Sequence, residues 1–571
     1  MTEQFTFIPK DRNYTLWNNE FVKNPFESKL FPNDVFSIIS NEVTIIHSVV
    51  RSTPEIPCVI VIAGNKTYGR HEKNNKLLYK CVPDNKLIPP FLVPYEIKQV
   101  GFSKVFVNLY VTITFVEWTG KHPVGLIKQV FGSVDVLENF YEYQLCCKCL
   151  NSSIQKFQKM TADALKKSNG SPIDDTGIEH REHLNVFSID PDNCVDFDDA
   201  FSIYETENEK ITCLSIYISN VTVLIDVLGL WGSFSNRVST IYLPDKKRSM
   251  LPTVLSDNLC SLQSGSLRVA LFMDLFIEND TIIDIKYGNA FIKLRKNYIY
   301  EEPDLLSNCV YGKLLDTCRS LTYKYKYIES IDDSHDVVCY LMILMNYHCA
   351  KELQLEKTGI FRSSHYSSPS SNMPSSNMPS SIVPYSVSKF IKIFNSARSQ
   401  YVKFSDDINH TMLNLDAYIH ITSPIRRLVD LLNMIEFQRV KGLFKLSNSA
   451  LDFYCKWSDK LDFINACTKS IRKVQNECDL LHLCSNNLTV MQKEYDGYLF
   501  NKNETHCTVF IPDLKLTSRI PVNQDIAEFS CHKFRLFLFR NEENFKQKIR
   551  LQLQLFTPFL ISNAHFTGQK K

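Results

Sequence analysis

The densest group of reactive side chains in this chain is the segment Asp190–Asp199, which reads Asp-Pro-Asp-Asn-Cys-Val-Asp-Phe-Asp-Asp. Five of its ten residues are aspartates, and apolar residues lie on both sides, with Phe187 and Ile189 before it and Ala200 and Phe201 after it. Carboxylates crowded beside a core repel one another unless protons or a multivalent cation offset their charge. Ligands that are all oxygen suit Mg²⁺, with Mn²⁺ as the alternative ion.

Two other interpretations of this segment compete with a metal site. A calcium-binding EF-hand loop needs Gly at its sixth position and Glu at its twelfth, but counting from Asp190 these positions hold Val195 and Phe201. The EF-hand interpretation therefore fails. A solvated acidic turn accounts for two or three aspartates and poorly for five between apolar runs, and it stays open as the alternative.

A second reactive feature is the run Thr422-Ser423-Pro424-Ile425-Arg426-Arg427. Helical spacing of the leucines that follow predicts a helix over 423–440, with Ser423 as N-cap and Pro424 at its first position. Two arginines in the first turn oppose the helix macrodipole by about 0.3–1 kcal/mol each. Beside free backbone N–H groups, their guanidinium groups predict a phosphate site. The alternative is a salt bridge to a nearby acid such as Asp430.

The two ends of the chain are predicted to be rich in β-strands. Residues 105–115 and 58–63 are rich in β-branched and aromatic residues, and the tail shows similar runs at 507–511, 534–539 and 548–556. Short strands separated by turns are typical of small barrels. Metal-binding carboxylates with an arginine pair favour phosphodiester chemistry, and flanking barrels favour a single-stranded nucleic acid as the substrate.

The centre of the chain mixes strands and helices. We expect strands at 214–218 and 268–277, a long helix over 336–355 and a further helix within 451–483. The stretch 367–381 contains Pro-Ser-Ser-Asn-Met twice and is expected to be a flexible surface loop.

Length and composition limit the classes of protein that remain. A chain of 571 residues suggests about four domains, and 44% apolar with 22% charged residues argues against wholesale disorder. The net charge of +2 is not that of a polybasic tail protein, so nucleic-acid binding must rest on local patches. One such patch is 533–571, which has eight Lys or Arg and two Asp or Glu.

Cysteine usage and the absence of targeting signals indicate a compartment. No secretory signal and no apolar stretch of 18 residues is visible, so we expect a protein of the cytoplasm or nucleus that is neither secreted nor a membrane protein. Cys146, Cys147 and Cys149 cluster, but no second cluster stands at zinc-finger spacing. Reduced thiols are therefore the expectation.

Several motifs, taken in chain order, resemble those of the ribonuclease II family, most nearly its eukaryotic exosome-nuclease branch. Asp190-Pro191, Asp196 and Asp198-Asp199-Ala200 match the family pattern Asp-Pro-x₄-Asp-x-Asp-Asp-Ala at every aspartate. The remaining matches are Arg237–Asp245, Met250–Pro252, Leu255–Leu262 and Tyr418–Arg427. The resemblance is specific over about 180–485 and weaker at both ends.

The resemblance implies an α+β, multidomain fold. It comprises two N-terminal cold-shock-type OB β-barrels at 1–52 and 53–150, a mixed α/β RNB catalytic domain at 151–488, and a C-terminal OB-type RNA-binding β-barrel with the basic tail at 489–571. The implied activity is processive, Mg²⁺-dependent 3′→5′ hydrolysis of single-stranded RNA to nucleoside 5′-monophosphates. We expect a monomer, with association with a larger RNA-decay complex left open.

The resemblance also assigns roles to individual residues. Asp190, Asp196, Asp198 and Asp199 would surround the metal, with Asp198 as the most rate-critical carboxylate, and Arg426 would stabilise charge on the scissile phosphate. Tyr242 matches a tyrosine that stacks on the 3′-terminal base, and in a strand it would face opposite to Ile241 and Leu243. Further expected contacts to RNA are Arg427, Arg362, Glu477 and a second stacking aromatic, either Phe361 or Tyr347.

The chain also departs from the family pattern at several positions. They are Val238 in place of Gly, Asn220 in place of Asp, Leu428 in place of Tyr, and Met434-Ile435 in place of His-Arg. None of them removes an expected metal ligand. They are the basis of the main alternative, a catalytically impaired RNA-binding protein of the same architecture. A hydrolase acting on another phosphoester is the third candidate.

Overall fold

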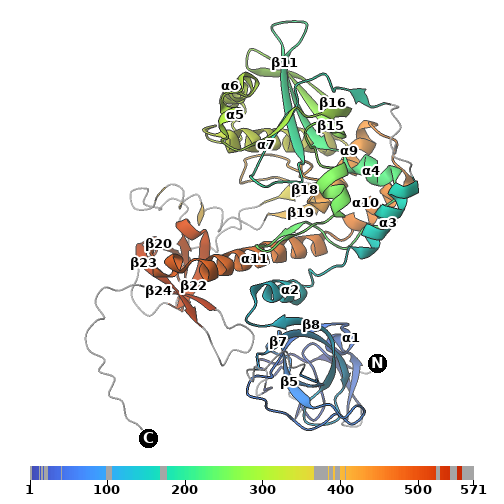
Figure 1. Cartoon of the computed structure of the whole chain (residues 1–571), viewed down its shortest axis with the longest axis vertical. Coiled ribbons are helices and arrows are strands. Elements are labelled where there is room, and N and C mark those ends of the chain that lie inside the picture. The colour runs from blue at the N-terminus through green and yellow to red at the C-terminus, as the bar shows by residue number, and fades with distance from the viewer. Residues whose placement is uncertain are drawn as a thin grey trace. The chain divides into compact units, whose positions relative to one another are not determined.

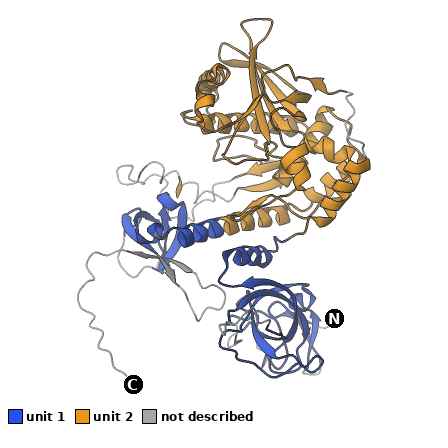
Figure 2. Ribbon diagram, viewed as in Figure 1, with its two compact units in different colours: residues 1–151, 476–571 blue, residues 152–475 orange. Residues whose placement is uncertain are grey.

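The computed structural model of the chain divides into two compact units (Figures 1 and 2). One unit comprises residues 1–151 and 476–571, and the other comprises residues 152–475. The structure describes all residues except 1–2, 12, 15–16, 19–23, 40–41, 98–105, 168–176, 365–383, 385–386, 388–389, 392–398, 406, 504, 522–526, 540–549 and 556–571. The expected loop 367–381 and most of the basic tail lie outside the described residues.

The unit of residues 152–475 is built on a seven-stranded mixed sheet in the order β17-β10-β11-β12-β15-β16-β9. Along the central strand β15, Leu271 and Met273 enter one core cluster while Ala270 and Phe272 enter another, because successive side chains point to opposite faces. The predicted strands at 214–218 and 268–277 are confirmed within β12 and β15. The strands are β9 (Glu179–His180), β10 (Phe187–Asp190), β11 (Asp199–Glu205), β12 (Thr212–Ser219), β15 (Leu267–Glu278), β16 (Thr281–Lys293) and β17 (Lys296–Ile299).

Helices α5, α6 and α7 pack on the sheet face that carries Leu271 and Met273 (Figure 1). The predicted helix over 336–355 is confirmed as α7, which starts at Ser334 because the Asp333 side chain accepts the N–H of Asp336 as its cap. The expected helix within 451–483 is two helices, α10 and α11. The helices are α3 (Gln155–Lys167), α4 (Val221–Val227), α5 (Pro303–Leu306), α6 (Cys309–Lys324), α7 (Ser334–Leu355), α9 (Leu428–Lys441), α10 (Asn448–Ser458) and α11 (Leu461–Asn486).

Short elements complete this unit. The hairpin strands β13 (Ile241–Tyr242) and β14 (Lys247–Arg248) pair with each other, as do β18 (Ile360–Ser363) and β19 (Gln400–Lys403). Two single-turn helices lie at Trp231–Ser233 and Leu255–Leu259.

A buried ion pair is layered against one face of the sheet. Arg181 donates both terminal nitrogens to the carboxylate of Asp274, each at 2.8 Å, and its guanidinium lies 3.4 Å from the ring centroid of Phe272. Phe272 stands opposite Gly288 on the neighbouring strand, and a Cβ at that glycine would lie 2.5 Å from the ring. The glycine therefore makes room for the ring under the ion pair.

Replacing Gly288 with Ala should lower the free energy of unfolding by about 1–3 kcal/mol, because the added methyl overpacks the site beneath Phe272. Denaturant titration followed by circular dichroism measures the change. Gly312 on α6 is the matched control, since a Cβ there meets nothing within 4 Å. A Gly288→Ala variant as stable as the Gly312→Ala variant would contradict the packing argument.

The first 151 residues contain a closed five-stranded barrel in the order β4-β5-β6-β8-β7. Before it lies a three-stranded antiparallel sheet, and the two share one core in which Phe7, Phe31 and Phe36 pack with Cys58 and Phe91. The predicted strands at 58–63 and 105–115 are observed as β4 and β7. The elements are β1 (Gln4–Thr6), β2 (Val35–Ile39), β3 (Glu42–His47), α1 (Val49–Ser52), β4 (Ile56–Ile60), β5 (Leu78–Pro83), β6 (Phe91–Pro94), β7 (Leu109–Glu117), β8 (Val124–Ser133) and α2 (Leu137–Cys147).

The C-terminal part of the same unit is a five-stranded antiparallel sheet in the order β22-β21-β20-β23-β24. The three predicted strands of the tail are confirmed as β21, β23 and β24. The elements are α12 (Leu488–Gln492), β20 (Glu494–Phe500), β21 (His506–Ile511), β22 (Leu516–Pro521), β23 (Cys531–Phe539) and β24 (Arg550–Leu555). Within the described part of the chain, no helix is long and apolar enough to cross a membrane.

Candidate active site

The four aspartates lie at one end of two neighbouring strands. β10 ends at Asp190 and β11 begins at Asp199, and the two strands pair antiparallel through Phe187 and Phe201. The apolar residues of both strands are buried in the sheet, which draws the connecting segment and its aspartates to the core edge. All four side chains are buried, with exposed fractions of 3–9%. The solvated acidic turn is therefore wrong as an interpretation of this segment.

Burial of these carboxyl groups changes their acidity. Removal from water raises the pKa of Asp198 to about 8. It also raises the pKa values of Asp190 and Asp199, and mutual repulsion within the cluster raises them further. A group of this kind favours any cation that enters it, because a cation replaces the protons that the crowded carboxylates otherwise need.

Asp198 and Asp196 are both engaged by neighbouring donors. Asp198 accepts the backbone N–H of Ile425 at 2.9 Å and the Nε of Arg426 at 3.2 Å. Asp196 accepts the hydroxyl of Tyr242 at 2.9 Å and the ammonium of Lys247 at 3.0 Å. The structure therefore brings Arg426 and Tyr242 to the carboxylates, and their expected contacts with the scissile phosphate and the terminal base stay predictions.

Asp190 and Asp199 provide the oxygens that suit a metal ion. Each has a buried Oδ2 without a hydrogen-bond partner among the described residues. Within the same residues, no three Asp, Glu, His or Cys side chains converge as a ready ligand set. Mg²⁺ is commonly bound through one or two carboxylates, with water and substrate phosphate completing its shell. Two unpartnered carboxylate oxygens in an all-oxygen cluster fit that pattern.

The turn that carries the arginines differs from the prediction. Helix α9 begins at Leu428 with Arg427 as its N-cap, so Ser423 is not the cap and neither arginine lies in the first turn. The backbone of this turn is instead bound to a separate segment, since Thr240 donates to the carbonyl of Arg426 and Leu428 donates to that of Val238, both at 2.9 Å. Because of these hydrogen bonds, the helix begins at Leu428 rather than near Ser423.

The two arginines have different surroundings. Arg427 donates to the fully buried carboxylate of Asp430 at 2.8 Å, which is the salt bridge that the sequence left open as the alternative. Asp430 also accepts the N–H of Ser423 at 2.8 Å, so this pair holds the turn together. Arg426 is the more exposed, with 46% of its side chain accessible. Of the two, Arg426 is placed to meet a substrate.

The remaining predicted contacts have mixed outcomes. Tyr242 is 39% exposed between the buried Ile241 and Leu243, which confirms the predicted orientation of its strand. Phe361 is wrong as a stacking residue, because its side chain is fully buried in the core under the sheet. Arg362 is half-buried, with its guanidinium 4.9 Å from the ring centroid of Tyr401. Glu477 lies on α11 within the other compact unit, and its contact with RNA stays a prediction.

The departures from the family pattern are structural positions. Val238, Leu428, Met434 and Ile435 are all buried apolar residues. Asn220 caps α4 and hydrogen-bonds to Asn289 at 2.8 Å and Gln438 at 3.1 Å in a buried amide network. None of these side chains bonds to the aspartate cluster. The departures therefore change how the core is packed rather than the carboxylates themselves.

Sequence reasoning missed Lys247, which contacts Asp196 at 3.0 Å, and also missed Tyr300. Burial, and then the charges of Asp199 and Asp190, raise the pKa of the Tyr300 phenol. Its ring stacks on His335 at 3.6 Å between centroids, and its N–H donates to the carbonyl of Asp190 at 3.1 Å. A tyrosine at the end of an ordinary β-strand gives no signal of this role.

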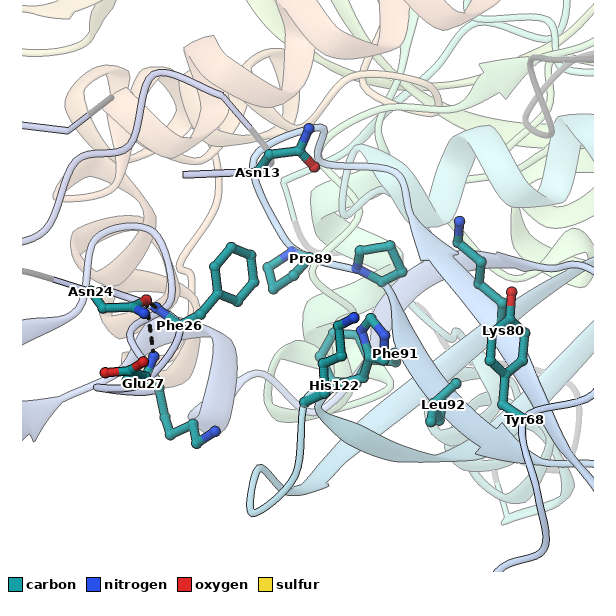
Figure 3. A pocket seen from close by; sticks show the side chains of 13 residues that line it. Asn13, Asn24, Phe26, Glu27, Tyr68, Lys80, Pro89, Phe91, Leu92 and His122 are labelled. Carbon is teal, nitrogen blue, oxygen red and sulfur yellow. Dashed lines mark hydrogen bonds between the residues drawn. The ribbon is translucent and has the colours of Figure 1, made fainter. Parts of the chain in front are cut away.

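A cavity of about 600 Å³ lies on the N-terminal barrel, in the other unit (Figure 3). It is lined by the second and third barrel strands, β5 and β6, by the loop before β5 and the loop after β7, and by residues between Asn13 and Lys29 that precede the barrel. This is the face on which OB-type barrels bind oligonucleotides. Lysines and rings surround it, with Glu27 as the one acidic residue of the lining: Lys29, Lys80, Lys121, Phe26, Tyr68, Phe91 and His122.

Together the fold and the site define a multidomain protein with a buried carboxylate cluster beside an exposed arginine. Residues 179–310 and 320–441 match the family model of the RNB domain. The chain therefore contains an RNB domain, which confirms its resemblance to the ribonuclease II-type nucleases.

Two curated relatives illustrate the similarity. Ribonuclease R of Buchnera aphidicola is 26% identical over 330 residues, which is 46% of this chain and 46% of the relative. The human exosome complex exonuclease RRP44 is 31% identical over 156 residues, or 26% of this chain and 16% of the relative. The chain thus aligns with less than half the length of either relative.

Solved structures share the fold. Apo RNase R of Mycoplasma genitalium matches 97% of this chain and all of its own chain, with a TM-score of 0.66 at 15% identity. The same protein in complex with ribose-methylated single-stranded RNA matches with a TM-score of 0.65. Yeast Ssd1, described as a pseudonuclease, matches 93% of this chain and 80% of its own, with a TM-score of 0.59 at 13% identity.

Proposed function

We propose that this chain is a divalent-cation-dependent 3′→5′ exoribonuclease that hydrolyses single-stranded RNA to nucleoside 5′-monophosphates. The observation that carries the proposal is the convergence of four buried aspartates, Arg426 and the half-exposed ring of Tyr242 inside an RNB domain. RNA binding by a structural relative of the whole chain supports the choice of substrate.

Each residue has a role in the proposed reaction. Asp190 and Asp199 would hold the cation, Mg²⁺ or Mn²⁺, which on binding supplies a water of lowered pKa as the nucleophile. Arg426 lies beside Asp198 and places a guanidinium where negative charge develops on the scissile phosphate. Tyr242 offers its exposed ring to the terminal base, and stacking there fixes the 3′ end for removal of one nucleotide at a time.

The activity is tested with a 3′-tailed RNA labelled at its 5′ end. We expect nucleoside 5′-monophosphates and a ladder of shortened RNA with Mg²⁺, and intact RNA with EDTA. Monophosphate release from dinucleotides or phosphosugars but not from RNA would instead identify the third candidate, a different phosphoesterase.

The catalytically impaired RNA-binding protein is the second candidate function. Two observations favour it: Asp196 and Asp198 are already occupied by internal donors, and the fold is shared with a protein described as a pseudonuclease. Under that candidate, RNA stays intact with Mg²⁺ or Mn²⁺ while a shifted protein–RNA complex forms on a native gel. Because the two candidates give opposite results on one RNA, a single experiment separates them.

The barrel cavity predicts how binding responds to salt. Lysines that contact phosphate release counterions, so the logarithm of the affinity for single-stranded RNA should fall linearly with the logarithm of salt concentration. Replacing Lys80 and Lys121 with Met should reduce that slope by about 1.4, at about 0.7 for each contact. Fluorescence anisotropy in EDTA measures it. Replacing the exposed Lys159 and Lys166 of α3 is the control, and equal slopes in both variants would contradict the role of the cavity.

Cellular location and partners are part of the same proposal. We propose that the protein acts in the cytoplasm or nucleus as a monomer, alone or attached to a larger RNA-decay complex. Similarity to an exosome nuclease supports the second arrangement. Affinity purification of the tagged chain followed by mass spectrometry distinguishes the two.

A further inference from the structure

The hairpin β13–β14 presents two side chains to one carboxylate. Tyr242 and Lys247 are directly opposite each other in its antiparallel register, so their side chains lie on the same face. The Tyr242 hydroxyl donates to Oδ2 of Asp196 at 2.9 Å, and the Lys247 ammonium contacts Oδ1 of the same residue at 3.0 Å. Lys247 also bonds to Asp257 at 2.8 Å, which fixes the far side of the ammonium.

The two oxygens of Asp196 are therefore both engaged by the hairpin. Asp190 and Asp199 differ from it, because each keeps a buried oxygen without a partner among the described residues. The cluster thus has two sides. Asp196 is bound by the hairpin, whereas Asp190 and Asp199 have oxygens available to a cation. The lysine ammonium carries a full positive charge beside Asp196, so it offsets that carboxylate without a metal ion.

The same contacts fix the orientation of Tyr242. Its hydroxyl is held by Asp196 while 39% of the residue remains exposed. The neighbouring Thr240 donates to the carbonyl of Arg426 at 2.9 Å, which joins the start of the hairpin to the arginine turn. A partly exposed ring held at its hydroxyl end loses little conformational entropy when a base stacks on it.

We propose that Lys247 is a positioning residue that serves the site in two ways. Its ammonium holds Asp196 and, through it, the Tyr242 hydroxyl, so that the ring is fixed for stacking before RNA arrives. It also takes the place of a second metal ion, so that Asp196 is not a metal ligand and the cluster binds one divalent cation. The stacking role rests on the proposed function, since it takes RNA as the ligand, whereas the cation count does not.

The stacking role is tested without metal or turnover. An RNA with 2-aminopurine at its 3′ end loses fluorescence when that base stacks on an aromatic ring. In EDTA, we expect the wild type and Lys247→Arg to quench it, and Lys247→Met and Lys247→Gln to quench as weakly as Tyr242→Leu. Lys246→Met removes the exposed neighbouring lysine and should quench like the wild type. Full quenching by a folded Lys247→Met protein would overturn this role.

The cation role is tested with Mn²⁺ alone. Titration of the full chain, followed by the electron paramagnetic resonance of free Mn²⁺, should give one bound ion for the wild type and for Lys246→Met. Lys247→Met should give two, because Asp196 then lacks a cation. Two ions in the wild type, or one in a Lys247→Met variant whose thermal unfolding is unchanged, would overturn it.

The two experiments separate this inference from the proposed nuclease activity. A wild type that leaves RNA intact, while Lys247→Met loses the 2-aminopurine quenching and binds a second Mn²⁺, would refute the nuclease and support the role of Lys247. If the wild type degrades RNA and Lys247→Met shows the same quenching and the same number of bound Mn²⁺ ions, the nuclease is supported and the role of Lys247 is refuted.

Discussion

Replacing Asp198 with Asn is expected to lower kcat for RNA hydrolysis by at least about a thousandfold and to leave RNA affinity within about twofold. The carboxylate is 3% exposed and lies beside Arg426, at the centre of the charged cluster. Asn has nearly the same shape and still accepts the N–H of Ile425, but it removes the negative charge that the cation and Arg426 are arranged around. Single-turnover degradation and anisotropy in EDTA measure the two quantities.

Two controls make the Asp198→Asn result interpretable. Thermal unfolding should be close to that of the wild type, because the substitution removes repulsion from Asp199 and Asp196 while it weakens the bond to Arg426. Asp192→Asn changes an exposed aspartate of the same segment and should degrade RNA at the wild-type rate. Wild-type turnover by Asp198→Asn would refute the assignment of this cluster as the catalytic centre.

The sequence was sufficient to predict the cluster because its residues are close together along the chain. Apolar runs on both sides of the segment favoured burial of its aspartates, and the structure buries four of the five. The long helix and central strands were equally predictable, since α7 and β15 have continuous apolar patterns without Pro or Gly. Local patterns of this kind do not depend on distant parts of the chain.

Features that depend on distant segments were not predictable. The start of α9 is set by backbone hydrogen bonds to residues 238–240, almost 190 residues away in sequence. The prediction of Ser423 as the N-cap was therefore wrong. Phe361 looked available for stacking, but residues distant in sequence bury it. Lys247 contacts Asp196 from strand β14 and Tyr300 bonds to Asp190 from the turn after β17, and a lone lysine or tyrosine carries no motif.

The second large effect is expected at Arg426. Replacing it with Ala should lower kcat by about a hundredfold to a thousandfold, which is the usual result of removing one preorganised donor from developing charge. Arg426→Lys should recover only part of this loss, because an ammonium keeps the charge but not the planar pair of donors. Single-turnover rates at saturating RNA measure the effect on the chemical step, and KM should change less than kcat.

Arg427 gives the matched comparison, because it is adjacent in sequence but bound to the buried Asp430. Arg427→Met should lower the free energy of unfolding by about 1–3 kcal/mol, since the fully buried Asp430 loses its cation, while the guanidinium, 29% exposed, was partly screened by solvent. Arg426→Ala should change stability far less, because 46% of that side chain is exposed. If Arg426→Ala destabilised the fold as much as Arg427→Met and left kcat intact, Arg426 would be structural. If Arg426→Ala lowers kcat and Arg427→Met lowers stability, Arg426 acts in the reaction and Arg427 stabilises the turn that carries it.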